Sequence, residues 1–146
     1  MSLAQDIAAF RAKLNMAIDR AMERNVGAAA VRKIVEAVQT EVYDAYVPKV
    51  YVRRKENGGL IDTSPDNIVV SYDDATKTLR VADMNRDNET GRLVAPIVES
   101  GKGYTYKTIP PRPFHKAAEE KMITDGDFEE ALAFGLTAQG FKVTKF

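Results

Sequence analysis

Few side chains in this sequence have the types and spacing that catalysis requires. His115 is the only histidine among the 146 residues, and the chain contains no cysteine. The lack of cysteine excludes disulfides, thiolate metal sites and cysteine nucleophiles. No serine motif accompanies His115, so we interpret it as a surface or half-buried residue near the start of a helix. The sequence therefore indicates a protein that is not an enzyme, and it predicts no cofactor.

Acidic residues in the middle of the chain invite comparison with a metal site or a hydrolase. They are Asp73, Asp74, Asp83, Asp87 and Glu89. Their spacing does not match the calcium loop of a helix–loop–helix hand, which needs a central glycine and a terminal bidentate glutamate. We therefore interpret these residues as solvated turn residues and predict no metal site.

The only compact basic run is Arg53-Arg54-Lys55, which precedes a turn at Asn57-Gly58-Gly59. Such a run is usually a solvated loop, but beside a glycine turn it can also form a projecting arm that meets an acidic neighbour or DNA. A second candidate contact is the pair Tyr104 and Tyr106, which has a lysine on either side. Aromatic residues that alternate with basic ones favour an interface, although two tyrosines at a strand end are also ordinary.

A stiff segment runs from Glu99, next to Gly101, to the proline-rich sequence around Arg112. Glu99 is either an inter-subunit carboxylate that pairs with Arg112 of the same or an adjacent copy, or a solvated charge at the edge of a loop. Arg112 lies between two prolines, and its five donors suit carboxylate or phosphate partners. We interpret it as a link from loop to sheet or from subunit to subunit, with DNA phosphate as the alternative. Phe114 is predicted to anchor the core.

The N-terminal third of the chain predicts two helices. The first, over residues 3–24, has an apolar stripe at helical spacing: Leu3, Ile7, Phe10, Leu14, Ile18 and Met22. Ser2 and Gln5 have the spacing of a capping box. Asn25 and Gly27 predict a break, because both residues tolerate the left-handed conformation that ends helices. A second helix is expected over residues 28–46, since Pro48 stops it.

The middle of the chain predicts a small sheet. Residues 67–72 and 78–82 are expected to form an antiparallel hairpin, and residues 84–92 an exposed, mobile loop. Residues 93–99 favour a third strand, although Pro96 allows an edge position or a short helical turn. The result is an α+β fold with N-terminal helices, a small, mostly antiparallel sheet and C-terminal helices.

The C-terminal part predicts two helices. One begins at Phe114, after Pro113, and a second follows Asp127, which has the spacing of a capping box with Glu130. Gly140 is placed to end that helix. Residues 141–144 are expected to form a last short strand or a tail that docks on a neighbour.

Composition indicates one soluble globular domain spanning residues 1–146. The chain has 45% hydrophobic and 29% charged residues, and 21 basic residues balance 21 acidic ones. A net charge of zero argues against a dedicated nucleic-acid binder and leaves no repulsion between copies. No apolar stretch approaches the ~20 residues of a membrane helix, and no signal peptide is visible.

From Leu60 onward the sequence resembles the small tail-component proteins of long-tailed double-stranded DNA phages, a family that includes tail-completion and neck proteins. Three motifs carry the resemblance in the family's order: Ile61-Asp62-Thr63-Ser64, Ala95-Pro96-Ile97-Val98-Glu99-Ser100-Gly101, and Pro111-Arg112-Pro113-Phe114 with Ala117. Ser64 departs from the family, which typically has glycine at that turn. The long polar segment 84–92 is a second departure.

The resemblance implies a structural virion protein without catalytic activity, at the head–tail junction or the head-proximal end of the tail. The resemblance does not distinguish among tail terminators, stoppers, head–tail connectors and minor tail subunits. Such proteins commonly act as hexameric rings, so the implied partners are other copies of the chain and neighbouring tail-tube and neck proteins. DNA is an incidental partner if the ring lumen carries it, and no membrane is involved. The implied location is the virion, after assembly in the host cytoplasm.

Contacts within a ring join different faces of neighbouring copies, and the loops at residues 53–60 and 84–92 are the candidates for these faces. Two other functional classes stay open. A small nucleic-acid-acting enzyme or toxin-like effector would use the Arg53–Lys55 run, His115 and an acidic residue on RNA. A monomeric adaptor would bind one partner through the edge of its sheet.

Overall fold

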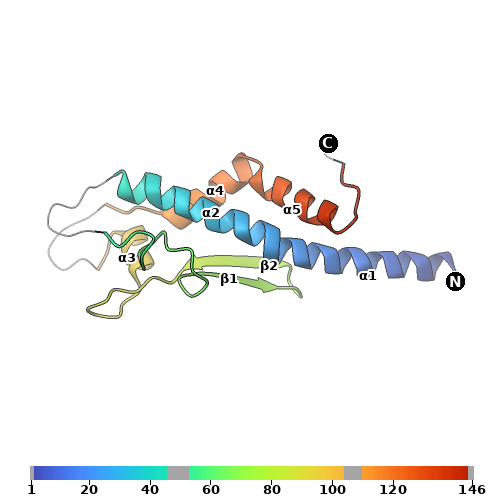
Figure 1. Cartoon of the computed structure of the whole chain (residues 1–146), viewed down its shortest axis with the longest axis horizontal. Helices are drawn as coiled ribbons and strands as arrows, with labels where there is room; N and C mark the ends of the chain where they lie inside the picture. Colours follow the sequence, from blue (N-terminus) through green and yellow to red (C-terminus); the bar gives the residue numbers. More distant parts are fainter. Residues whose placement is uncertain (1, 46–52, 104–109, 145–146) are drawn as a thin grey trace.

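The computed structural model describes residues 2–45, 53–103 and 110–144 of the chain. The fold is α+β, as the sequence predicts, with a long N-terminal helical rod, an antiparallel hairpin and C-terminal helices. Figure 1 shows the hairpin along one side of the rod and the C-terminal helices along the other.

The rod contains two α-helices, each followed by a π-helical segment: α1 (Leu3–Ala21), η1 (Met22–Val26), α2 (Gly27–Ala37) and η2 (Val38–Tyr43). The predicted capping box is present at its start, where the Ser2 hydroxyl accepts a hydrogen bond from the backbone N–H of Gln5 at 3.2 Å. The first four N–H groups of any helix lack partners within it, and the capping box supplies partners to two of them, which favours the start of the rod here.

The predicted break at Asn25 and Gly27 is wrong, because the helix continues through both residues. Gly27 has a helical φ of −56°. A Cβ atom at this position would lie 3.0 Å from a methyl carbon of Val70. Glycine is therefore used here to let a strand approach the rod closely, and its tolerance of left-handed conformations is not used.

The hairpin consists of β1 (Ile68–Asp73) and β2 (Thr78–Asp83), which pair antiparallel with Val70 opposite Val81. Both strands lie within one residue of their predicted bounds. Their β-branched residues suit a pleated surface that is buried on one face only, and that face packs on η1 and α2.

The third predicted strand, over residues 93–99, is wrong, because these residues form helix α3 (Val94–Ser100). Ala95 and Val98 are buried on one face of α3 at helical spacing. Pro96 lies in the first turn, where its missing N–H is harmless, and Gly101 ends the helix with a left-handed φ of 70°. These helix-boundary residues outweigh the strand preference of the valines and the isoleucine.

Two further helices complete the fold: α4 (Phe114–Thr124) and α5 (Asp127–Ala138). The residue before α5 is Gly126, at φ 76°, and no side chain caps this helix, so the capping role expected for Asp127 is wrong. The strand expected at residues 141–144 does not form. The tail lies beside α1 and away from the hairpin, with the Phe141 ring 6.3 Å from that of Phe10.

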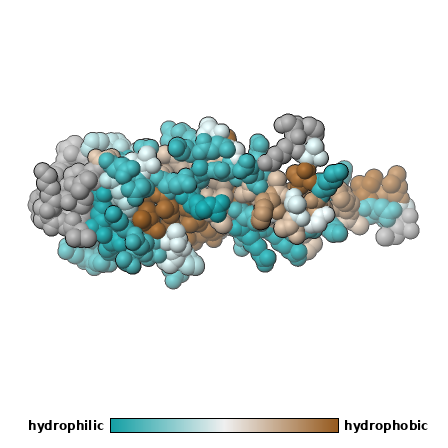
Figure 2. Space-filling model, turned by 45° about the horizontal axis from the view of Figure 1, so that its top comes forward, coloured by the Kyte–Doolittle hydropathy of each residue, from teal (hydrophilic) through white to brown (hydrophobic). Residues whose placement is uncertain are grey.

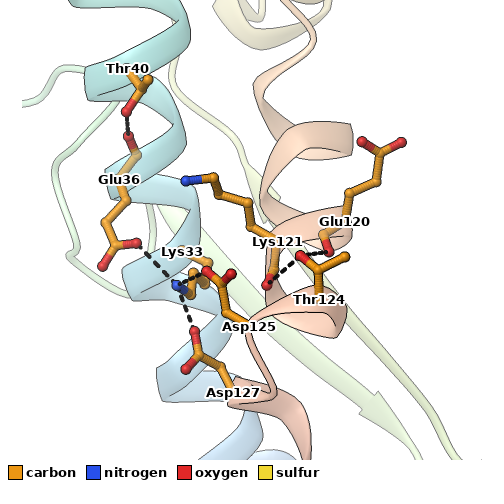
Figure 3. A network of polar contacts seen from close by, with 8 residues as sticks. All are labelled: Lys33, Glu36, Thr40, Glu120, Lys121, Thr124, Asp125 and Asp127. Atoms are coloured by element: carbon orange, nitrogen blue, oxygen red, sulfur yellow. Dashed lines mark hydrogen bonds and ion pairs between the residues drawn. The ribbon is translucent and has the colours of Figure 1, made fainter.

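A network of ion pairs holds the α4–α5 corner on α2 (Figure 3). The ammonium group of Lys33 contacts three carboxylates, those of Glu36 at 3.3 Å, Asp125 at 3.1 Å and Asp127 at 2.6 Å. The hydrogen bonds that Lys33 donates to Asp127 and Asp125 raise the pKa of Lys33 above its ordinary value. Asp127 is thus engaged by α2, which explains why it does not cap its own helix.

The main core lies between α2, the hairpin, α3 and α4. Phe114 is its largest fully buried side chain, with 0% of its surface exposed. It packs in one cluster with residues from every neighbouring element, among them Ile34, Val38, Ile68 and Val98. The predicted role of Phe114 as a core anchor is confirmed.

Candidate functional site at the loop end

The loops predicted to make contacts, 53–60 and 84–92, lie together at the end of the molecule opposite the N-terminus of α1 (Figure 1). Residues 53–64, 84–93, α3 and 110–115 form this region, which we call the loop end. It holds the candidate contact residues Arg53, Arg54, Lys55, Glu99 and Arg112, whereas the tail at residues 141–144 lies beside α1. Tyr104 and Tyr106 lie outside the described residues.

The basic run folds back onto the protein. The Arg53 guanidinium donates a hydrogen bond to the carbonyl oxygen of Tyr43 at 3.0 Å and lies 4.6 Å from the centre of the Tyr43 ring. Lys55, which is exposed, has its ammonium group 6.0 Å from the same ring. Cation–π contacts of this kind stabilise both partners. This geometry differs from the projecting arm that the sequence allowed.

Arg54 fastens the two loops to each other. Its guanidinium donates to the side chain of Asn88 at 3.0 Å, to that of Asn85 at 3.2 Å and to the carbonyl oxygen of Arg86 at 3.0 Å. The planar, multidentate guanidinium suits such a set of acceptors better than an ammonium group does. The two loops therefore form one continuous surface.

Asn85 and Asn67 extend the same hydrogen-bond network into the protein. Asn85 is only 4% exposed, and its amide donates to the carbonyl oxygen of Gly58 and to the side chain of Asn67. Asn67 in turn donates to the carbonyl oxygens of Gly59 and Asp62. Because buried amides are costly unless they are hydrogen-bonded, this network fixes the shape of the loop.

The 84–92 segment forms a hydrogen-bonded turn. The Asp87 carboxylate accepts hydrogen bonds from the hydroxyl and the backbone N–H of Thr90, at 2.7 and 3.1 Å, and these bonds lower the pKa of Asp87. Arg86 pairs with Leu93 in an antiparallel bridge at the base of the turn. Asp73, Asp74 and Glu89 are exposed in turns or at their edges, as expected.

The prediction that Asp83 is a solvated turn residue is wrong. It ends β2 and is 3% exposed. Its Oδ1 accepts the N–H of Asn85 at 3.0 Å, whereas its Oδ2 is buried without a hydrogen-bond partner. Burial, helped by the charges of Asp62 and Glu99, raises the pKa of Asp83 to about 7. A buried carboxyl group is more stable in its neutral form.

Glu99 and His115 form the other half of the site. The Glu99 carboxylate accepts the backbone N–H of His115 at 3.0 Å, in the first turn of α4, and also contacts the imidazole Nδ1. A carboxylate at a helix N-terminus is favourable. The imidazole Nε2 accepts the backbone N–H of Asp83 at 3.0 Å. This assigns the proton of the neutral ring to Nδ1, which faces Glu99.

These contacts form one chain, through Arg54, Asn85, Asp83, His115 and Glu99, which we call the polar junction. It ties the loops to the end of β2, to α4 and to α3. Both ring nitrogens of His115 are engaged within the protein. The arrangement is suited to fixing the geometry of the loop end, and it leaves His115 no free nitrogen for proton transfer to a substrate.

Arg112 lies beside this junction. Its backbone N–H donates to the carbonyl oxygen of Val98 at 3.0 Å, and its own carbonyl oxygen accepts the N–H of Phe114 at 2.9 Å. These bonds fasten the proline-rich segment to α3. Glu99 lies on α3 and Arg112 lies on the segment hydrogen-bonded to α3, so the structure brings the two residues near each other.

Asn85 and Asn67 are the site residues that sequence reasoning missed. One local pattern could have indicated Asn85. It follows Asp83 by two residues, and an aspartate often accepts the N–H two residues further on. Asn67 directly precedes a strand, where asparagine commonly marks a turn, and nothing local indicates its partners.

Two clefts lie away from the loop end, along α5. They have volumes of about 410 and 560 Å³, and both are lined by Arg24 and Asn25. Neither is lined by a residue of the polar junction. Within residues 2–45, 53–103 and 110–144, no group of three or more histidine, aspartate or glutamate side chains is placed to hold a metal ion. In the same ranges no helix combines the length and apolar character needed to span a bilayer.

Comparison with known proteins finds a family and a prophage-derived relative. A family described as YomN matches residues 6–138. The chain is similar to a protein described as "SPbeta prophage-derived uncharacterized protein YomN" from Bacillus subtilis (strain 168). The two are 31% identical over 124 residues, which is 81% of each chain. No solved structure matches the chain significantly.

Proposed function

We propose that this chain, which belongs to the phage-associated YomN family, is a structural component of the phage particle. Its proposed position is the head–tail junction or the head-proximal end of the tail, where it acts in tail completion or head–tail joining. We propose a ring of identical subunits, hexameric in order, as its working form. The proposed location is the virion, after assembly in the host cytoplasm.

The polar junction is the observation that carries this proposal. Three side chains at the loop end could take part in catalysis or ligand binding, but all are hydrogen-bonded within the same chain: Arg54, His115 and Glu99. A protein that works by shape needs a surface of fixed geometry, and buried, satisfied polar networks supply one. An RNA-acting enzyme would instead need Arg54 and His115 to be available to the substrate.

The loop end is also suited to contact with other subunits. Contacts that close a ring join one face of a subunit to a different face of the next. Lys55 and Glu89 are exposed on the two loops, and the network behind these loops holds them in place. The proposed partners of this surface are other copies of the chain and the neighbouring tail-tube and neck proteins.

Particles purified from an induced lysogen test the proposal directly. We expect mass spectrometry to detect the chain in the particles, and deletion of its gene to leave heads and tails unjoined or tails incomplete. Absence of the chain from purified particles would contradict the proposal.

A matched pair of charge reversals tests the surface. Lys55→Glu is expected to reduce particle assembly, because Lys55 is exposed on the loop end. Lys121→Glu, at an exposed position on α4, is the control and is expected to leave assembly unchanged. If the two variants assemble equally well, the loop end is not the contact surface.

A further inference from the structure

The N-terminal half of α1 carries an apolar face that the described part of the chain leaves largely open. Leu3 is 75% exposed, Ile7 45% and Phe10 56%, although the Phe141 ring of the C-terminal tail lies 6.3 Å from that of Phe10. Figure 1 shows this half of α1 projecting beyond the other elements, and Figure 2 shows apolar surface at its tip. An exposed apolar patch of contiguous residues marks an interaction site more often than a single exposed residue does.

The spacing of this face is that of a coiled coil. Its residues follow one another at alternating steps of four and three: Leu3, Ile7, Phe10, Leu14, Ala17 and Ala21. We call this row the α1 seam. Its inner end is already used within the chain, because Ala17 and Ala21 are buried. There α5 approaches so closely that a Cβ atom at Gly135 would lie 2.6 Å from the Cβ of Ala21.

We propose that the outer half of the α1 seam, from Leu3 to Leu14, docks on the same segment of a second copy of this chain, with the two helices antiparallel. The inference deepens the proposed assembly role, and its functional meaning rests on that role. It names the partner and the surface of one contact.

The position of α5 favours the antiparallel orientation. In a parallel, in-register pair the second helix continues along the seam to Ala17 and Ala21, where α5 already lies. In an antiparallel pair with Ile7 opposite Phe10 of the partner copy, Leu3 faces Leu14. The second helix then begins just before the part of the seam that α5 covers, and the two protein bodies lie at opposite ends.

Charges beside the seam are complementary in this arrangement. With Ile7 and Leu14 at a positions, Asp6 and Lys13 occupy g positions, which flank the core of a coiled coil. Antiparallel helices bring g residues opposite each other, so Asp6 of each copy faces Lys13 of the other. Both residues are exposed. The zero net charge of the chain adds no repulsion between whole copies.

This contact has two-fold symmetry, so by itself it yields a dimer. It therefore acts in addition to the loop end, which lies at the opposite end of the rod (Figure 1). A subunit with one contact surface at each end can join its own ring through one and a second ring through the other.

The first test is the mass of the purified chain, measured by sedimentation equilibrium over a wide range of concentrations. We expect a monomer–dimer equilibrium whose dissociation constant rises at least ~10-fold in Phe10→Glu, a change of about 1.4 kcal/mol or more. Ile123→Glu is the control, since Ile123 is 68% exposed on α4 and lies off the seam. A monomer at every concentration would overturn the proposal, as would a dimer that Phe10→Glu leaves intact.

Charge reversal tests the orientation. Asp6→Lys and Lys13→Asp each place two like-charged pairs across the antiparallel dimer, and each is expected to weaken it by about 5- to 10-fold. Mixing the two variants pairs lysine with aspartate on both sides, so a heterodimer of wild-type affinity is expected. In a parallel pair Lys13 faces Ile18, so an unchanged affinity in Lys13→Asp would overturn the antiparallel arrangement.

These measurements use the purified chain alone and are separate from the detection of the chain in phage particles. A dimer that is absent from particles would contradict the proposed function and leave the seam contact standing. A chain found in particles but monomeric in solution, with Phe10→Glu assembling normally, would contradict the seam contact and leave the proposed function standing.

Discussion

Replacing Asp83 with asparagine is expected to remove a loss of stability that the wild-type protein undergoes between weakly acidic and neutral pH. Asp83 is 3% exposed, and its Oδ2 has no hydrogen-bond partner. Burial raises its pKa from the ordinary value of 3.8 to about 7. Between these two values the folded protein holds a proton on Asp83 that the unfolded chain has lost.

The sign follows from the number of protons bound in each state. Because the folded state binds more protons across this window, the free energy of unfolding falls as the pH rises from 3.8 to about 7. A shift of roughly 3 units at about 1.4 kcal/mol each gives an upper limit of about 4 kcal/mol for the loss. Stability from this group is complete below pH 3.8 and is gone above pH 7.

Asparagine keeps the shape of the side chain and one carbonyl oxygen, which can still accept the N–H of Asn85. It removes the charge and the titration. Its NH₂ group takes the place of the unpartnered Oδ2 and has a desolvation cost of about 1–3 kcal/mol at every pH. Asp83→Asn is therefore expected to be less stable than the wild type near pH 4 and more stable near pH 8, with a flat profile in between.

Urea denaturation followed by far-UV circular dichroism, repeated from pH 4 to pH 8, measures this profile. Asp87→Asn is the matched control. Hydrogen bonds from Thr90 lower the pKa of Asp87, so its stabilising effect is lost only as the pH falls through that lowered value. Asp87→Asn should keep the wild-type slope above pH 4. If Asp83→Asn also keeps that slope, the buried carboxyl is not its source.

The remaining predictions concern side-chain packing and the hydrogen bonds that Arg54 donates to the 84–92 loop. Phe114→Ala should lower the free energy of unfolding by ~3–5 kcal/mol, because Phe114 is 0% exposed; a thermal melt that overlays the wild type would refute its core role. Gly135→Ala should cost about 1–3 kcal/mol, since the added methyl group meets Ala21 across the α1–α5 crossing, whereas Thr137→Ala on the exposed face of α5 should change little. Arg54→Lys should speed amide hydrogen exchange in the 84–92 loop, because an ammonium group cannot bind all three acceptors together. Unchanged exchange would show that the hydrogen bonds of Arg54 do not stabilise the loop.

The sequence predicts the elements of this fold well where a local pattern decides them. The capping box at Ser2 marks the first residue of the rod, and alternation of apolar and polar residues marks both strands. Phe114 is an aromatic residue placed directly after a proline, at the start of an apolar helical face, and this local setting was enough to identify the core anchor.

The errors arise where one residue type serves two purposes. Gly27 reads as a helix end, but it provides room for Val70, which is distant in sequence. Val94, Ile97 and Val98 favour a strand, but Pro96 and Gly101 are equally good markers of a short helix. Only contacts with the rest of the fold choose between the alternatives, and a single sequence contains no record of those contacts.

The candidate site shows the same limit more strongly. Asp73 and Asp83 each end a strand, but Asp73 is exposed at the hairpin turn whereas Asp83 meets the start of α4 and is buried. Its partners His115 and Asn85 come from a helix and a loop, so their meeting depends on how the fold brings the start of α4 to the end of β2.

The α1 seam is a stripe whose role the sequence alone does not reveal. Leu3, Ile7 and Phe10 read as a core stripe, since their spacing is the same as that of the buried Ala17 and Ala21. In the fold, α5 covers only the inner part of the stripe and the outer part is exposed. Within the described chain the Phe141 ring of the tail lies beside Phe10, but much of the outer stripe stays exposed, and exposed apolar surface disfavours the isolated subunit. A second subunit removes that disadvantage, which is why we infer a contact between copies at this end of the rod.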